Sequence, residues 1–345
     1  MKKIFMNYKW LFLILCVTLL ICSTYVVTIG AVSLKGIDVW KIIANRTTGK
    51  MIFDKEWKDS IEIIVWNLRV PRILMGIVSG GGLALVGILM QCLTKNPLAS
   101  PYILGISAGA STGAVMALLF LGGTMFTVPL GAFIFGTLTA LMVFYFAGSG
   151  GFSSARLVLI GVAVSSLFSG ITTLMIMMAP NEKSLRSAMF WMSGSLSGAT
   201  WEYIPLAVIS LVLATALIYP RYRELNILVT GDENAIALGV DVKKIRVLTM
   251  LIATFLTGII VSNTGIIGFV GLIIPHIVRG IVGGNHKKNI PCSIVMGAIF
   301  LIMTDTIARS IYPLQEIPIG VITSIIGAPF FLNMLRKKSY SFGGE

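Results

Sequence analysis

The residues that most clearly suggest chemistry are three arginines and an aspartate near the ends of apolar segments. Asp305 and Arg309 are four residues apart, so in a helix they share one face and can form an ion pair. Arg69 and Arg72 flank a Val-Pro pair at the start of another apolar segment. One interpretation is a local ion pair together with anchoring at a membrane interface. The other is an exposed patch for the carboxylates of a docking protein, since a guanidinium can donate two parallel hydrogen bonds to one carboxylate.

Two polar segments interrupt the apolar sequence. Residues 231–240 read GDENAIALGV, in which an Asp-Glu-Asn run can cap a short helix and Gly239 fits its C-terminal stop. Such a helix predicts a docking site for a soluble partner, and a solvated loop is the alternative. In the second segment, residues 93–100, Asn96-Pro97 predicts a tight turn between two helices.

No group of residues is typical of an enzyme. Gly49-Lys50 resembles the end of a phosphate-binding loop, but Ala44 and Met51 stand where that loop requires glycine and serine or threonine. The four cysteines fall in apolar segments, and the two histidines lack nearby cysteine or carboxylate partners. We therefore expect no catalytic residues, no metal and no cofactor. Any energy from ATP has to enter through a separate subunit.

The composition is that of a membrane protein. Hydrophobic residues make up 56% of the 345 residues, and charged residues make up 12%, compared with about a quarter in soluble domains. The sequence predicts an all-α polytopic membrane protein in which residues 1–345 form a single domain. The first apolar stretch exceeds the usual apolar core of a signal peptide, so a retained helix is expected. About ten transmembrane helices are predicted, at residues 10–30, 68–92, 101–121, 126–147, 154–178, 203–220, 247–264, 267–283, 291–308 and 319–336.

The net charge of +13 is better explained by topology than by nucleic-acid binding, because the basic residues cluster at helix ends. An even number of spans puts both termini on one side, and the distribution of Lys and Arg favours the cytoplasm. The segment 31–67 is then external and the segment 220–246 cytoplasmic. The motifs RVPR (69–72) and KIR (244–246) open helices that start on opposite sides, which suggests an inverted internal repeat.

Several motifs together resemble the permease subunit of the ABC importers for iron-siderophores, haem and cobalamin, the type II ABC importers. They occur in family order across nearly the whole chain. The motifs are LRVPR (68–72), NPLASPYILGISAGAS (96–111), FWMSGSLSG (190–198), GDENAIALGV (231–240), GFVGLIIPHIVR (268–279), DTIAR (305–309) and PIGVITSIIGAPFF (318–331).

This resemblance implies two permease subunits, either identical or different, around a central pathway. It also implies two cytoplasmic ATPase subunits and an extracytoplasmic substrate-binding protein. Docking of the binding protein is expected at Arg69, Arg72 and Arg309. Coupling to the ATPase is expected at Gly231, Asp232, Glu233, Ala235, Leu238 and Gly239, and the cytoplasmic gate at Asn96, Leu98, Ser153 and Ser154.

The expected function is import of an iron-siderophore-type metal chelate across the plasma (inner) membrane into the cytoplasm. Haem, cobalamin and an oxyanion are alternative cargoes for the same architecture. An ion-coupled secondary transporter is a further alternative, which the scarcity of buried acidic residues disfavours. An intramembrane enzyme is disfavoured by the missing catalytic residues.

Overall fold

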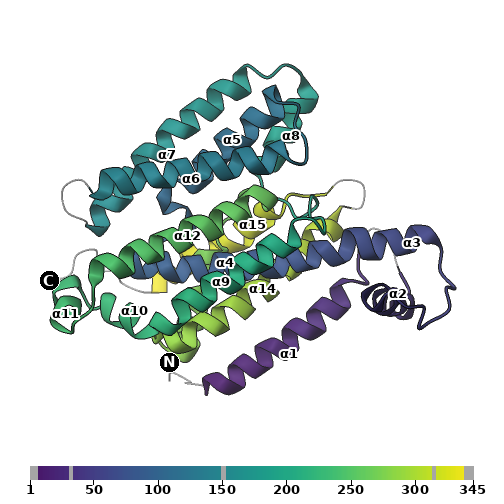
Figure 1. Ribbon diagram of the computed structural model, residues 1–345, viewed down its shortest axis with the longest axis horizontal. Helices are drawn as coiled ribbons and strands as arrows, with labels where there is room; N and C mark the ends of the chain where they lie inside the picture. Colours follow the sequence, from purple (N-terminus) through teal and green to yellow (C-terminus); the bar gives the residue numbers. More distant parts are fainter. Residues whose placement is uncertain (1–6, 31–33, 149–152, 313–315, 338–345) are drawn as a thin grey trace.

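Helices make up the regular structure of the described part of the chain (Figure 1). The computed structural model describes residues 7–30, 34–148, 153–312 and 316–337, and no strand occurs among them. Seven helical stretches of these residues are long and apolar enough to cross a membrane. The prediction of an all-α polytopic membrane protein is confirmed. The placement of the termini in the cytoplasm stays a prediction, as does the inverted repeat.

The helices coincide with the apolar windows of the sequence. The seven long stretches contain α1 (Tyr8–Val26), α4 (Val70–Leu93), α6 (Thr127–Gly148), α7 (Ser154–Met177), α9 (Ile204–Ile218), α12 (Val242–Thr264) and α14 (His286–Ile311). The stretch that begins with α9 continues to Leu228. Three further helices occupy the other three predicted spans: α5 (Ile106–Phe120), α13 (Val270–Val282) and α15 (Ile319–Lys337). The remaining elements are α2 (Gly36–Thr48), α3 (Asp59–Ile63), η1 (Ile64–Arg69), η2 (Pro101–Leu104), α8 (Glu182–Met192), η3 (Tyr219–Arg221), α10 (Tyr222–Leu228) and α11 (Asp232–Ala237).

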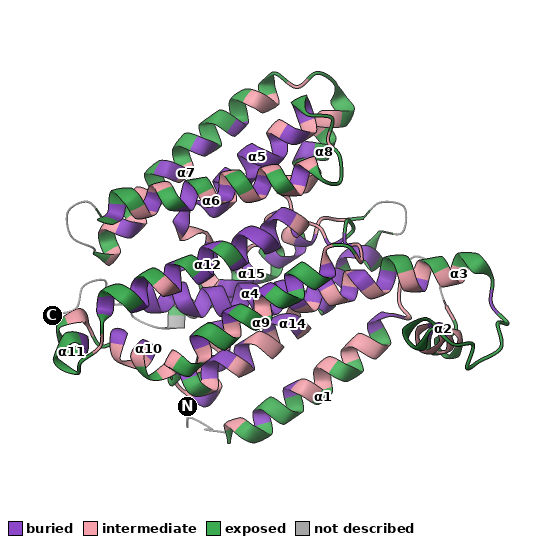
Figure 2. Cartoon of the chain, in the orientation of Figure 1, coloured by how far each residue is buried: buried purple, intermediate pink, exposed green. Residues whose placement is uncertain are grey.

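Helix α4 is the central helix of the bundle. It packs against α9, α12, α13 and α14. In the continuous helical stretch Asp59–Leu93, 89% of the most apolar window is buried, compared with 17% for α1. Figure 2 shows this contrast between the buried α4 and the largely exposed faces of α1 and α7. A second group, formed by α5, α6, α7 and α8, joins the α4 group through α12, which packs on both α5 and α6.

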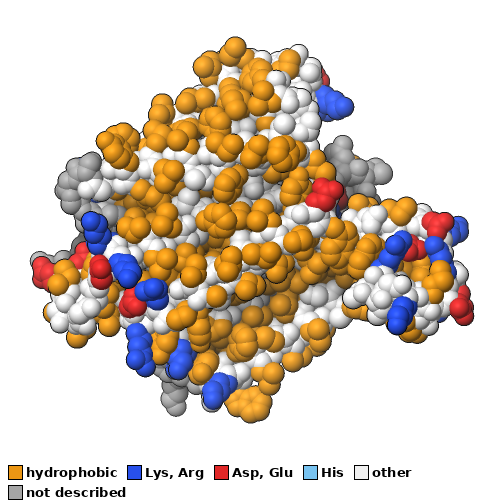
Figure 3. Space-filling view, viewed as in Figure 1, with side chains coloured by type: hydrophobic (Ala, Val, Ile, Leu, Met, Phe, Trp, Pro, Cys, Tyr) orange, Lys and Arg blue, Asp and Glu red, His pale blue; other side chains and the backbone are white. Residues whose placement is uncertain are grey.

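The surface separates charged from apolar side chains. In Figure 3, hydrophobic side chains cover the middle of the visible face, and Lys, Arg, Asp and Glu gather near the ends of the helices. A helical bundle surrounded by lipid requires this distribution, because charged side chains are costly in the hydrocarbon layer. At one end the polar segment around α2 is held by ion pairs, Arg46 to Glu62 at 2.6 Å and Lys41 to Glu56 at 2.9 Å.

Glycines let α4 approach its neighbours closely. A Cβ atom on Gly80 would collide with the backbone of Gly297 in α14. A Cβ on Gly87 would collide with the backbone of Gly271 in α13. In lipid the hydrophobic effect does not drive helices together, so such close backbone contact is a main source of helix association.

The short helices α5 and α13 each follow an irregular segment, and these two segments meet. Tyr102 in η2 donates its hydroxyl to the carbonyl of Ile267 at 2.8 Å and accepts from the Ile267 N–H at 3.0 Å. Gly105 has φ 72° just before α5, and Phe269 has φ 66° just before α13. The Tyr102 hydroxyl thus satisfies the N–H and the carbonyl of Ile267, which lies in the irregular segment before α13.

Gly87→Ala should lower the free energy of unfolding by about 1–3 kcal/mol, because the new methyl group forces the backbones of α4 and α13 apart. The measurement is thermal unfolding of the purified chain in detergent. Gly280→Ala in α13 is the matched control, since a Cβ there meets nothing within 4 Å. Unchanged stability of Gly87→Ala, or an equal loss in the control, would contradict the packing argument.

Candidate functional site

Arg69 and Arg72 lie where a π-helical turn meets α4. Pro71 has no N–H, so the regular hydrogen-bond ladder is interrupted here. In η1 the chain forms a π turn instead, and the Val70 N–H bonds the carbonyl of Val65, five residues back. Turns of this kind often occur at functional sites.

Asp305 is the centre of a buried ionic cluster at the start of α4. Its side chain is only 3% exposed. Arg72 donates to both carboxylate oxygens, with Nε to Oδ2 at 3.0 Å and Nη2 to Oδ1 at 2.9 Å. The Nε of Arg309, one helical turn further along α14, lies 3.7 Å from Oδ2. This geometry connects α4 to α14 by a bidentate, desolvated ion pair.

Arg69 and Arg309 hold the end of α1. Arg69 Nη1 donates to the carbonyls of Val27 and Thr28 at 2.8 and 2.9 Å, and Arg309 Nη2 donates to the carbonyl of Val26 at 2.7 Å. The last carbonyls of a helix lack intrahelical partners and carry partial negative charge, so cations are favourable there. The two arginines therefore fasten the loosely packed α1 to the bundle.

The structure favours a local ion pair over an exposed docking patch for Arg309, but it does not test docking. The local ion pair of Asp305 with Arg309 is present, as the first interpretation has it. Arg69 and Arg309 are buried, which contradicts the alternative of an exposed Arg309. The sequence could not show that the end of α1 covers both side chains. Arg72 Nη1 also donates to Glu316 at 2.7 Å, and the Glu316 side chain is 42% exposed. The docking role itself stays a prediction.

At the opposite end of the bundle, α11 forms the short helix that was predicted (Figure 1). Gly239 follows its end with φ 78°, as the predicted C-terminal stop requires. The N-cap residue is Gly231, and no side chain caps the helix there. The predicted capping by the acidic run is therefore wrong, and the carboxylate of Asp232 is engaged elsewhere.

Asp232 pairs with two cations that come from different parts of the chain. Its Oδ1 lies 2.9 Å from Lys95 Nζ, and its Oδ2 accepts from Arg246 Nη2. Burial raises the pKa of Asp232, but the bonds from Arg246 and Lys95 outweigh burial and hold this pKa below its ordinary value. Asp232 is therefore ionised at neutral pH and links α11 to α12 and to the end of α4.

The predicted gate residues gather around the end of α4. The Asn96 side chain accepts from the Leu98 N–H at 2.9 Å and so shapes the turn locally. Ser154 Oγ donates to the carbonyl of Leu93 at 3.2 Å, which joins the start of α7 to this turn. Ser153 caps α7 by accepting from the Arg156 N–H at 3.1 Å. The structure thus joins Ser154 to the end of α4 and gives Ser153 a capping role. The gate role of these residues stays a prediction.

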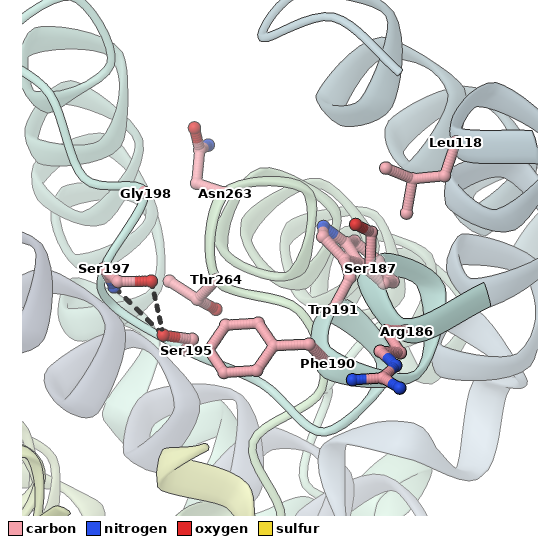
Figure 4. A pocket seen from close by; sticks show the side chains of 10 residues that line it. All are labelled: Leu118, Arg186, Ser187, Phe190, Trp191, Ser195, Ser197, Gly198, Asn263 and Thr264. Atoms are coloured by element: carbon pink, nitrogen blue, oxygen red, sulfur yellow. Dashed lines mark hydrogen bonds between the residues drawn. The ribbon is translucent and has the colours of Figure 1, made fainter. Parts of the chain in front are cut away.

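A cavity of about 470 Å³ lies between α8, the segment after it and the end of α12. Figure 4 shows hydroxyl, amide and aromatic side chains around it, and Ser195 and Ser197 lie in hydrogen-bond contact at 2.8 Å. Such a lining suits a polar ligand with flat or apolar surfaces. The cavity is lined by Leu118, Arg186, Ser187, Phe190, Trp191, Ser195, Ser197, Gly198, Asn263 and Thr264.

The sequence matches the FecCD transport family over residues 15–337. The chain belongs to this family. It is 38% identical to the cobalamin import system permease of Halobacterium salinarum, over 81% of this chain and 75% of the relative. It is 39% identical to an Fe(3+)-citrate import system permease of Bacillus subtilis, over 81% and 84%. It is 33% identical to the molybdate import system permease of Haemophilus influenzae, over 93% and 94%.

The fold of this FecCD permease also matches a solved structure. A metal-chelate-type ABC transporter in an inward-facing conformation superposes with a TM-score of 0.82 at 31% identity, covering 95% of this chain and 99% of the other. The predicted family is therefore confirmed, and the chain is an ABC importer permease. Its relatives carry different cargoes by name, so family membership alone does not select one.

Sequence reasoning missed several residues that the FecCD permease brings into these sites. Lys95 and Arg246 are separated by more than a hundred residues, so only the fold shows that both contact Asp232. The FWMSGSLSG motif indicated the family, but nothing in its pattern showed that it lines a cavity with Asn263. Lys95 left a local signal as a charged residue at a helix end directly before Asn-Pro, and Arg246 belongs to the KIR motif at the start of a helix.

Proposed function

We propose that this FecCD permease moves an iron-siderophore-type metal chelate into the cytoplasm, driven by two separate ATPase subunits. The end of the bundle with α10 and α11 faces the cytoplasm, together with both termini. The end with Asp305 faces the binding protein. Two such subunits, of one kind or two, enclose the pathway.

The observation that carries this proposal is the exposed apolar surface of α11. Ile236 and Leu238 are each 66% exposed, although they lie in a polar segment outside the long apolar helices. Ala235 is buried and anchors the helix to the bundle. An anchored short helix with exposed apolar side chains fits insertion into a groove of a soluble subunit.

The arginine cluster supports docking of a binding protein at the other end. Arg72 already binds two carboxylates of its own chain, Asp305 and the half-exposed Glu316. A carboxylate of the binding protein can take the place of Glu316 on Arg72 Nη1, while Asp305 keeps the guanidinium in position. Arg69 and Arg309 support this arrangement by holding α1 beside the cluster.

The chemistry of the cavity and the relatives support a chelate as cargo. The lining of the cavity is mostly uncharged. Its one charged residue among those that the structure describes, Arg186, has an acidic partner in the same helix, with Arg186 Nη2 3.4 Å from Glu182 Oε2. Hydroxyl and amide groups can bind an oxygen-rich chelate without holding it by strong charge. One of the relatives, the Bacillus subtilis permease, is named for the import of an iron chelate, Fe(3+)-citrate.

Ile236→Ser should prevent co-purification of the ATPase with the tagged permease, because it removes an apolar contact from the exposed face of α11. Ile37→Ser is the matched control, since Ile37 is 67% exposed but lies in α2 at the opposite end. Both variants should keep the melting temperature of the parent. Wild-type recovery of the ATPase with Ile236→Ser would contradict the docking assignment.

Glu316→Gln should raise the affinity for the binding protein, because it weakens the ion pair in which Glu316 occupies Arg72 Nη1. The gain should be a few-fold, because a partly exposed ion pair contributes about 1 kcal/mol or less, and should shrink at high salt. The measurement is binding of the purified partner to the permease in nanodiscs. Glu202→Gln, an equal charge change at an exposed residue before α9, serves as the control. Equal affinities in all three proteins would argue against docking on Arg72.

Vesicles with the permease, its ATPase and its binding protein should accumulate a labelled ferric hydroxamate siderophore when ATP is supplied. Ferric citrate, haem, cyanocobalamin and molybdate form the comparison set in the same assay. Preference for another member of the set would overturn the cargo and leave the permease function intact. Uptake without the ATPase, driven by an ion gradient, would overturn the ATP-driven mechanism.

A further inference from the structure

Lys95 occupies a backbone conformation that is unusual for its residue type. It follows Thr94, the C-cap of α4, with φ 50°. This left-handed position after a helix is most often glycine, because a Cβ atom there meets the following carbonyl. Lys95 therefore adopts a backbone conformation that its residue type disfavours.

The Lys95 side chain extends from the turn to α11. Its Nζ lies 2.9 Å from Asp232 Oδ1, and the two side chains are 31% and 35% exposed. Arg246, only 10% exposed, binds the other oxygen of Asp232 and so fixes the carboxylate against α12. The ion pair of Lys95 with Asp232 thus connects the turn between α4 and α5 to α11.

The same turn is connected to α7. Leu93, two residues before Lys95, accepts the hydrogen bond from Ser154. Asn96, the next residue, orders the backbone of Leu98. Lys95 thus lies between two hydrogen-bonded residues of the turn, Leu93 and Asn96. A displacement of Lys95 would therefore also move these two residues.

We propose that the Lys95–Asp232 ion pair is the positioning contact that transmits movement of α11 to the turn at residues 94–100. When an ATPase displaces α11, Asp232 moves with it and Lys95 draws the turn along. Lys95 contacts neither cargo nor nucleotide in this scheme and acts through the turn. The inference rests on the proposed function, because it takes α11 as the element that the ATPase moves.

Lys95→Gly separates transmission from folding. Glycine relieves the left-handed backbone and removes the ion pair at once, so a purely structural Lys95 predicts equal or greater stability and normal coupling. If Lys95 transmits movement as proposed, Lys95→Gly should show equal or greater thermal stability but lose coupling. Lys95→Arg keeps the cation and should keep coupling.

Coupling is read from a cysteine placed in the turn. Ser100→Cys is introduced into a chain in which Cys16 and Cys22 are replaced by alanine, while the buried Cys92 and Cys292 remain. The rate of labelling by a membrane-impermeant maleimide is measured in the permease–ATPase complex, with and without ATP and vanadate. In the parent, nucleotide should change this rate by about 5-fold or more, the usual lower range of allosteric coupling.

The result expected for Lys95→Gly is ATP hydrolysis with a labelling rate that no longer responds to nucleotide. Lys95→Arg should respond as the parent does. A full response in Lys95→Gly, with a responding parent, would overturn the inference alone. A parent complex whose labelling ignores nucleotide would overturn the proposed coupling through α11, and the inference with it.

Discussion

The close backbone contact of α4 with α13 and α14 is the constraint on which the rest of the molecule depends. Gly80 meets Gly297 and Gly87 meets Gly271, so the central helix is enclosed by neighbours along its length. Every backbone polar group of such a helix has to be satisfied within the bundle. The irregular segments before α5 and α13 meet this requirement through the two hydrogen bonds of Tyr102 with Ile267.

Both candidate sites are attached to the ends of this one helix. Arg72 begins α4 and binds Asp305, whereas Lys95 follows its last turn and binds Asp232. Because α4 is a continuous, buried helix, its length defines the distance between the two clusters. In the proposed function, the binding protein at one end and the ATPase at the other would therefore act on a common element.

Much of the fold could be predicted from the sequence, since each apolar window corresponds to a helix and Gly239 ends α11 as its residue type suggests. Local spacing also predicted the ion pair between Asp305 and Arg309. The pairing of Arg72 with Asp305 could not be predicted, because it joins residues 233 positions apart. The burial of Arg69 and Arg309 likewise depends on where α1 ends in space, and no periodicity of the sequence carries that information.

The two ionic clusters differ in a way that suits different tasks. Asp305 is almost fully buried and held by a bidentate arginine, and removing one partner of such a pair costs about 3–5 kcal/mol. Asp232 and Lys95 are about one-third exposed, and Lys95 has an unfavourable backbone conformation, so their contact is weaker and more readily broken or shifted. A cluster that is costly to disturb is suited to hold α1, α4 and α14 in fixed positions. A cluster with a small free-energy difference between its paired and separated states is suited to move with a partner, because that partner has to supply only a modest amount of binding energy.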